Sequence, residues 1–156
     1  SIMWNNFITC DGQIITDIIK YIDEQIKTKP VIDIHLCTDS KMRNNQIIFI
    51  SAIVFNYKEK GSHIIYNKTY EYGKKDVYSR LWKEVETTHK LATYLDDNLL
   101  NIKEILIINL DLNPKKQYKS SQLHDTGYKW LNGLGFKVLT KKHDNTFGIS
   151  AADYFS

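Results

Sequence analysis

The chain has 156 residues, of which 42% are hydrophobic and 25% are charged. This composition is that of an ordinary globular protein, and the length is typical of one domain rather than two. A formal net charge of only +3 excludes a strongly basic surface over the whole protein and a polybasic membrane anchor. Cys10 and Cys37 belong to no CxxC pair or Cys/His cluster. We therefore expect reduced thiols and a cytoplasmic protein.

The sequence contains little that would divide it into separate units. It has seven glycines and two prolines, with no linker-like tract and no repeat. The longest apolar runs, such as residues 47–55, are well short of the ~20 residues that a transmembrane helix needs. We expect a single domain over residues 1–156, with residues 1–30 as an N-terminal helical extension and no association with a membrane.

The first half of the chain predicts one helix followed by three strands. Isoleucines recur at steps of three and four residues over 11–27, which is the pattern of an amphipathic helix. Segments with high strand propensity follow at 31–38, 46–57 and 62–72, and Asn44-Asn45 is the expected turn between the first two. This succession predicts an antiparallel meander.

The second half alternates between helices and strands. A helical period marks residues 76–100, the longest expected helix, and the apolar run within 102–112 predicts a central parallel strand buried on both faces. A helix from Ser120 or Ser121 to about Leu134, a short strand at 136–140 and a last helix from near Phe147 follow. The order predicts an α/β fold with a mixed five-stranded sheet, in which strands 1–3 form the meander and strands 4 and 5 are parallel, with helices on both faces.

Four acidic residues occupy positions where a carboxylate is costly without a function. Asp39 and Asp111 are each expected at the end of a strand, Glu84 lies on the apolar face of the long helix, and Asp153 lies in the last helix. Carboxylates brought close together need a counter-charge, and oxygen ligands suit Mg²⁺ or Mn²⁺ better than Zn²⁺. The sequence therefore predicts a metal site formed by these four residues, although each one alone also fits a turn or a helix cap.

Other charged residues border the predicted site or lie away from it. Glu86 falls with Trp82 and Lys90 on a more solvated stripe of the long helix. Basic residues follow Asp39 and Asp111 and precede the last helix, where they fit either solvated loops or contacts to nucleic-acid phosphates. These candidate nucleic-acid-binding residues are Lys41, Arg43, Lys115, Lys116, Lys119, Lys141 and Lys142.

The order of elements and several short segments are similar to the YkuK family of ribonuclease H-like proteins. The segments are Thr38-Asp39-Ser40, Lys83-Glu84-Val85-Glu86, Leu110-Asp111-Leu112-Asn113-Pro114 and Ala151-Ala152-Asp153, and the resemblance spans nearly the whole chain. Cys37 departs from the glycine expected before this Thr-Asp-Ser segment, and residues 141–144 lack an expected Pro-Ser element. The resemblance implies a ribonuclease H fold with a metal-dependent nuclease site at the four carboxylates. It also implies a role for His143 in catalytic proton transfer, since some members of this superfamily place a mobile histidine before the last acid.

Two functional hypotheses follow. The first is a nuclease that uses Mg²⁺ or Mn²⁺ to hydrolyse phosphodiester bonds in RNA, RNA/DNA hybrid or branched DNA. The alternative is a non-catalytic ribonuclease H-like module that binds nucleic acid or a protein partner in a larger assembly or as a homo-oligomer. The abundance of Ile, Lys and Asn points to an AT-rich genome, so the expected location is the cytoplasm of a bacterial or phage-infected cell.

Overall fold

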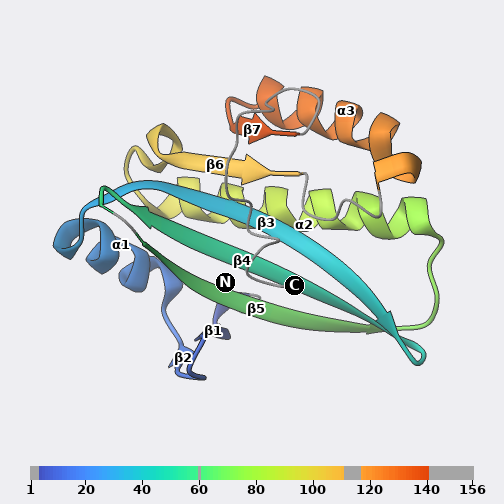
Figure 1. The fold of residues 1–156 in the computed structure, drawn as a ribbon, viewed down its shortest axis with the longest axis horizontal. Helices are drawn as coiled ribbons and strands as arrows, with labels where there is room; N and C mark the ends of the chain where they lie inside the picture. The colour runs from blue at the N-terminus through green and yellow to red at the C-terminus, as the bar shows by residue number, and fades with distance from the viewer. Residues whose placement is uncertain (1–3, 60, 111–116, 141–156) are drawn as a thin grey trace.

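The computed structural model describes residues 4–59, 61–110 and 117–140. Over these residues the chain forms one mixed sheet and three α-helices (Figure 1). The sheet has seven strands in the order β2-β1-β5-β4-β3-β6-β7. The predicted mixed α/β architecture is confirmed, and the predicted number of five strands is wrong.

The predicted meander is present as β3 (Val31–Arg43), β4 (Gln46–Tyr57) and β5 (Ser62–Tyr72). All three strands are antiparallel, and Asn44 has a positive φ of 55° at the tip of the first hairpin. β3 continues well beyond residue 38, because β4 is long enough to pair with it as far as Arg43. Asp39 therefore lies inside a strand, opposite Ile50, and the prediction that it ends the strand is wrong.

The parallel half of the sheet follows the prediction. β6 (Leu106–Asn109) pairs with β3 and with β7 (Lys137–Leu139), in both cases in parallel. All four residues of β6 are buried, as expected for a strand covered on both faces. The start of the predicted strand is instead the short 3-10 helix η2 (Ile102–Glu104).

The two additional strands come from the segment before the first helix. β1 (Phe7–Thr9) and β2 (Ile14–Ile15) form a hairpin, and β1 pairs with the edge of β5. Gly12, with φ of 89°, makes the turn, and the Thr9 N–H donates to the carbonyl of Gln13 at 3.0 Å. A positive φ is readily adopted by glycine, so this turn interrupts the predicted helix over 11–27.

The first helix consequently begins later than predicted. Asp17 caps α1 (Ile18–Thr28) by accepting a hydrogen bond from the Lys20 N–H at 3.1 Å. Ile18 and Ile22 are buried on its inner side. The predicted N-terminal helical extension thus contains a hairpin as well as a helix.

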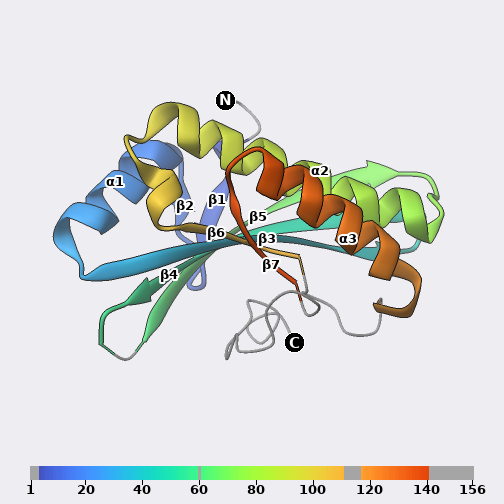
Figure 2. The same cartoon turned by 90° about the horizontal axis from the view of Figure 1, so that it is seen from above.

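The three described helices all cover the same face of the sheet (Figure 2). α2 (Val77–Asn98) lies over the middle of the sheet and packs against β3 and against α3 (Gln117–Gly133). The main core fills the space between sheet and helices, with Leu36, Phe55 and Leu95 among its fully buried side chains. Helices on both faces were predicted, but the expected last helix lies outside the described residues, and the described helices bury one face only.

A smaller apolar cluster occupies the opposite face of the sheet. It consists of Cys37, Ala52, Val54 and Ile64, with Tyr66 packed against it. The two cysteines are free, as predicted, with Cys10 exposed and Cys37 buried. No helix among the described residues is long and apolar enough to cross a membrane.

Candidate functional site

Ser40 connects two of the predicted site carboxylates where β3 meets α2. Its hydroxyl donates a hydrogen bond to Glu84 Oε2 at 2.5 Å, and its backbone N–H donates to Asp39 Oδ1 at 2.9 Å. The Ser40 side chain is buried, while Asp39 and Glu84 are half-buried. Ser40 thus contacts an acid of β3 and an acid of α2.

A second polar contact joins the same two elements one helical turn further along. The Thr88 hydroxyl donates to Thr38 Oγ1 at 2.8 Å, and the hydroxyls of Thr38 and Ser51 are 2.9 Å apart. All three residues are buried. Four residues rise about 6 Å along a helix and two residues span about 6.6 Å along a strand, so the two elements match in step. The two contacts together fix how α2 sits on β3.

The Asp39 side chain lies on the face of the sheet opposite to α2, because neighbouring side chains of a strand point to opposite sides. Thr38 and Ser40 contact α2, whereas Cys37 belongs to the cluster on the far face. Burial raises the pKa of the Cys37 thiol, and the negative charges of Asp39 and Glu84 raise it further. The thiol stays protonated, and both carboxylates contribute to a negative potential around it.

The structure places only part of the predicted metal site. Ser40 hydrogen-bonds to both Asp39 and Glu84, whereas Asp111, Asp153 and His143 lie outside the described residues. Over the described ranges, no group of three or more His, Cys, Asp or Glu side chains could hold a metal ion.

The predicted nucleic-acid-binding residues are also described only in part. Lys41 and Arg43 are exposed on β3, past Asp39 toward the tip of the hairpin. Lys119 lies in the first turn of α3, where side chains are not described. The remaining lysines of this set lie outside the described residues, namely Lys115, Lys116, Lys141 and Lys142.

The sequence did not single out the hydroxyl groups that hold this site. The sequence pattern assigned no function to Thr38, Ser40 or Thr88. A usable signal was present: Thr38 and Ser40 are two residues apart on a strand, and Glu84 and Thr88 are four apart on a helix. Polar pairs with these spacings fit one face of a strand that packs against one face of a helix.

An antiparallel meander is followed by a helix and two parallel strands, with acids on β3 and on α2, which is the order of elements expected for a ribonuclease H-like protein. The family model described as Ribonuclease H-like matches residues 13–156. The chain therefore belongs to this family, and the resemblance to the YkuK proteins is confirmed. Comparison with curated proteins and with solved structures finds no match.

Proposed function

We propose that the protein is a nuclease that depends on a divalent metal ion and hydrolyses phosphodiester bonds. The observation that carries this proposal is the link from Asp39 through Ser40 to Glu84 at the contact between β3 and α2. Membership of the ribonuclease H-like family supports a function on nucleic acid, as a nuclease or as a binding protein.

The donor chemistry of this region fits a hard cation. Asp39 and Glu84 offer carboxylate oxygens, and the nearby Cys37 is not a competing soft ligand because its raised pKa keeps it protonated. Asp39, Glu84, Asp111 and Asp153 would hold Mg²⁺ or Mn²⁺. When bound, such ions supply an activated water molecule and stabilise the leaving oxygen.

The pairing of β3 with β6 supports including Asp111 in this set. Leu36 is paired with Ile108 in parallel, and Asp39 and Asp111 each follow their paired residue by three positions. Strands that run in parallel carry their following residues toward the same edge of a sheet. We assign Asp153 and His143 from the family resemblance, with His143 as the residue that transfers a proton.

The substrate class in this proposal is RNA, RNA/DNA hybrid or branched DNA. Lys41 and Arg43 are exposed on the same strand as Asp39 and would contact phosphates there without reading sequence. A protein that only binds nucleic acid is the competing outcome, and the following experiment separates it from a nuclease.

The test is cleavage of labelled RNA, hybrid and branched DNA in Mn²⁺, Mg²⁺ or EDTA. We expect cleavage by the wild type only with metal, and loss of cleavage in Asp39→Asn and Glu84→Gln. Asp23→Asn, the same change on the exposed side of α1, is the matched control and should cleave as the wild type does. Thermal unfolding with Mn²⁺ gives an independent readout, since a bound ion raises the melting temperature of the wild type but not of Asp39→Asn. Cleavage retained by both site variants would refute the mechanism, and binding without cleavage would identify a non-catalytic protein.

A further inference from the structure

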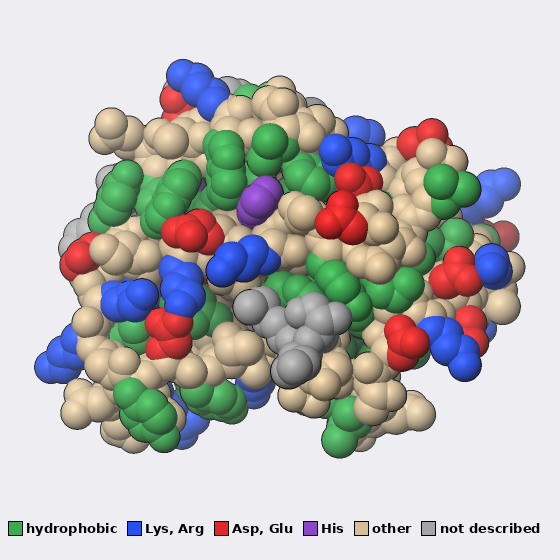
Figure 3. Space-filling view, turned by 180° about the vertical axis from the view of Figure 1, so that it is seen from behind, with side chains coloured by type: hydrophobic (Ala, Val, Ile, Leu, Met, Phe, Trp, Pro, Cys, Tyr) green, Lys and Arg blue, Asp and Glu red, His purple; other side chains and the backbone are tan. Residues whose placement is uncertain are grey.

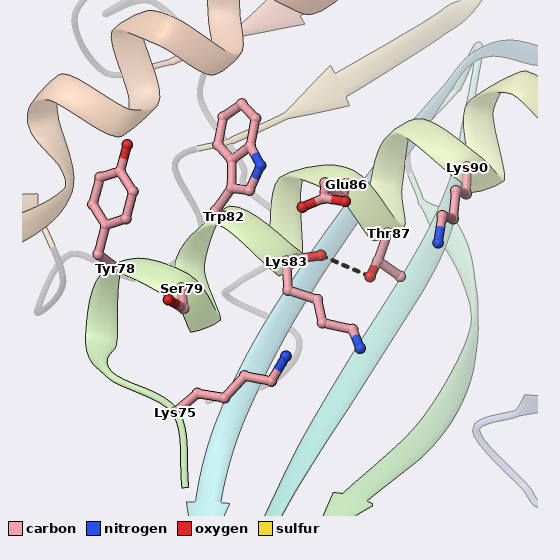
Figure 4. Close-up of a pocket in the computed structure, with 8 residues that line it drawn as sticks. All are labelled: Lys75, Tyr78, Ser79, Trp82, Lys83, Glu86, Thr87 and Lys90. Carbon is pink, nitrogen blue, oxygen red and sulfur yellow. Dashed lines mark hydrogen bonds between the residues drawn. The ribbon is translucent and has the colours of Figure 1, made fainter.

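The outward side of α2 carries a groove that is separate from the site around Glu84. The groove has a volume of about 370 Å³, and its lining residues recur at steps of three and four along the helix (Figure 4). Such steps place side chains on one face of a helix. The lining includes Lys75, Tyr78, Trp82, Lys83, Glu86 and Lys90.

Three lysines give this groove its charge. Lys75 and Lys83 both pair with Glu71 of β5, Lys75 at 3.6 Å, and the Lys83 ammonium also lies 5.4 Å from the centre of the Phe49 ring. Lys90 is exposed at the other end of the groove. Three lysines and one acid, Glu86, line the groove, while Glu71 pairs with two of these lysines and Asp76 accepts hydrogen bonds from Ser79 of the lining.

Aromatic rings accompany these charges. Figure 4 shows Tyr78 and Trp82 pointing toward α3, away from the lysine ammonium groups. Tyr78 is 57% exposed, and Trp82 is supported by Trp130 of α3, with ring centres 5.7 Å apart. Trp130 in turn contacts His89, at 4.4 Å between ring centres. The space-filling view of the helix-covered face shows hydrophobic side chains on both sides of a histidine, with lysines and acidic residues nearby (Figure 3).

We infer that this groove binds a segment of single-stranded nucleic acid, with phosphates at Lys75, Lys83 and Lys90 and bases stacked on Tyr78 and Trp82. Tyr78 is exposed and Trp82 is half-buried. Aromatic rings near cationic side chains are the combination that binds single strands without sequence preference. An acidic peptide would use the lysines but would leave the aromatic rings without stacked partners. The choice of nucleic acid as the ligand rests on the proposed function. The groove itself is independent of it, because it shares no lining residue with the carboxylate site.

The groove and the carboxylate site lie on different sides of one helix. Glu84 contacts Ser40 of the sheet, whereas its neighbour Lys83 lines the groove. A strand in the groove would therefore be held beside the site and not in it. This arrangement adds affinity for a single-stranded flank of the substrate.

The test measures binding apart from cleavage. Anisotropy of labelled 12-nucleotide oligo(dT) and oligo(rU) is recorded in EDTA over a range of KCl concentrations, with Asp39→Asn protein so that no cleavage occurs. Each lysine that contacts phosphate contributes about 0.7 to the slope of log K against log salt. We expect Lys75→Gln/Lys90→Gln to lower the slope by about 1.4. Lys20→Gln/Lys29→Gln, at the exposed surface of α1 and its C-terminal end, is the matched control and should leave the slope unchanged.

A second variant tests the stacking separately from the charge. Tyr78→Ala should weaken binding about fivefold or more at fixed salt and leave the slope unchanged, since stacking does not depend on counterions. Tyr78 is exposed, so this variant should fold, as circular dichroism will show. Equal losses in the Lys20/Lys29 control, wild-type affinity in Tyr78→Ala, or equally strong competition by poly-glutamate would each overturn the inference. If cleavage is seen while the groove variants bind normally, binding in the groove is refuted and the proposed nuclease function is kept. If the groove variants lose binding but no substrate is cleaved with metal, binding in the groove is kept and the nuclease function is refuted.

Discussion

The Ser40 hydroxyl donates a hydrogen bond of 2.5 Å to Glu84 Oε2, across the contact between β3 and α2. The same residue holds Asp39 through its backbone N–H. Ser40 is thus a positioning residue: it orients the Glu84 carboxylate without being one of the four proposed ligands. Groups that hydrogen-bond to metal ligands orient them and tune metal binding.

Ser40→Ala should lower the affinity for Mn²⁺, or the metal-dependent cleavage rate, by about 10- to 100-fold. Ser40→Thr keeps the hydroxyl and should restore much of this loss. Ser51→Ala removes a buried hydroxyl from the neighbouring strand and is the matched control, since Ser51 contacts Thr38 and not Glu84. The measurement is the Mn²⁺ dependence of kcat together with KM for the nucleic acid. An equal effect of Ser51→Ala on metal affinity would mean that Ser40 has only a structural role.

The buried hydroxyls of Thr38 and Thr88 should contribute to stability rather than to chemistry. Thr88→Val keeps the shape of the side chain but removes the hydrogen bond to Thr38, which should lower the free energy of unfolding by about 1 kcal/mol. Thr87→Val, on the half-exposed neighbouring residue, should change it by less than about 0.5 kcal/mol. Urea unfolding of both variants measures the difference. Equal stabilities would contradict a role for the Thr38–Thr88 contact in holding α2 on the sheet.

The local sequence pattern was sufficient to predict those elements whose strand-forming and turn residues lie close together in the sequence. The bounds of β4 and β5 agree with the predicted strands, because each strand-forming segment is enclosed by turn residues. The N-terminal isoleucines were ambiguous, since Ile14 and Ile15 fit a helix or a strand equally well. They form a strand because the turn at Gly12 pairs them with β1. β1 in turn pairs with the edge of β5, a partner too far along the chain for periodicity to detect.

The candidate site shows the same limit. Helical periodicity correctly placed Glu84 on the face of α2 that contacts the sheet, because that property depends on one segment only. The position of Asp39 inside β3 depends on how far β4 extends beside it. The role of Ser40 depends on a contact between residues 44 positions apart. Neither property is present in a local window of sequence.

Close packing of α3 on α2 requires a small residue at position 127. A Cβ atom on Gly127 would lie 3.3 Å from Val85 Cγ1 and 3.4 Å from Leu110 Cδ1, so there is little space for a side chain. Gly127→Leu should lower the free energy of unfolding by about 1–3 kcal/mol through overpacking. Gly133→Leu in the same helix is the matched control, since nothing lies within 4 Å of its Cβ position, and it should be no less stable than the wild type. Thermal and urea unfolding test this, and equal stability of the two variants would contradict the close contact.

His63 should make the protein less stable in mild acid. Its Nε2 lies 2.5 Å from the Tyr21 hydroxyl and its ring stacks on Phe55, with ring centres 5.8 Å apart. Burial lowers the pKa of His63 below its ordinary value of 6.5, and the charge of Asp11 only partly opposes this. The unfolded chain therefore binds the proton more readily than the folded protein does. The stability from neutral His63 is complete above pH 6.5 and is lost as the pH falls through the lowered pKa.

The sign of this effect can be checked at one residue. Burial also lowers the pKa values of His35 and His89, so His63→Gln should remove only part of the decrease in unfolding free energy between about pH 7 and pH 5. Asp11→Asn removes the charge that favours protonated His63 and should lower its pKa further. Titration of the His63 ring by NMR in the wild type and in Asp11→Asn measures both pKa values. A wild-type pKa above 6.5 would show that charge and not burial controls this histidine, and a rise in Asp11→Asn would contradict the effect assigned to Asp11.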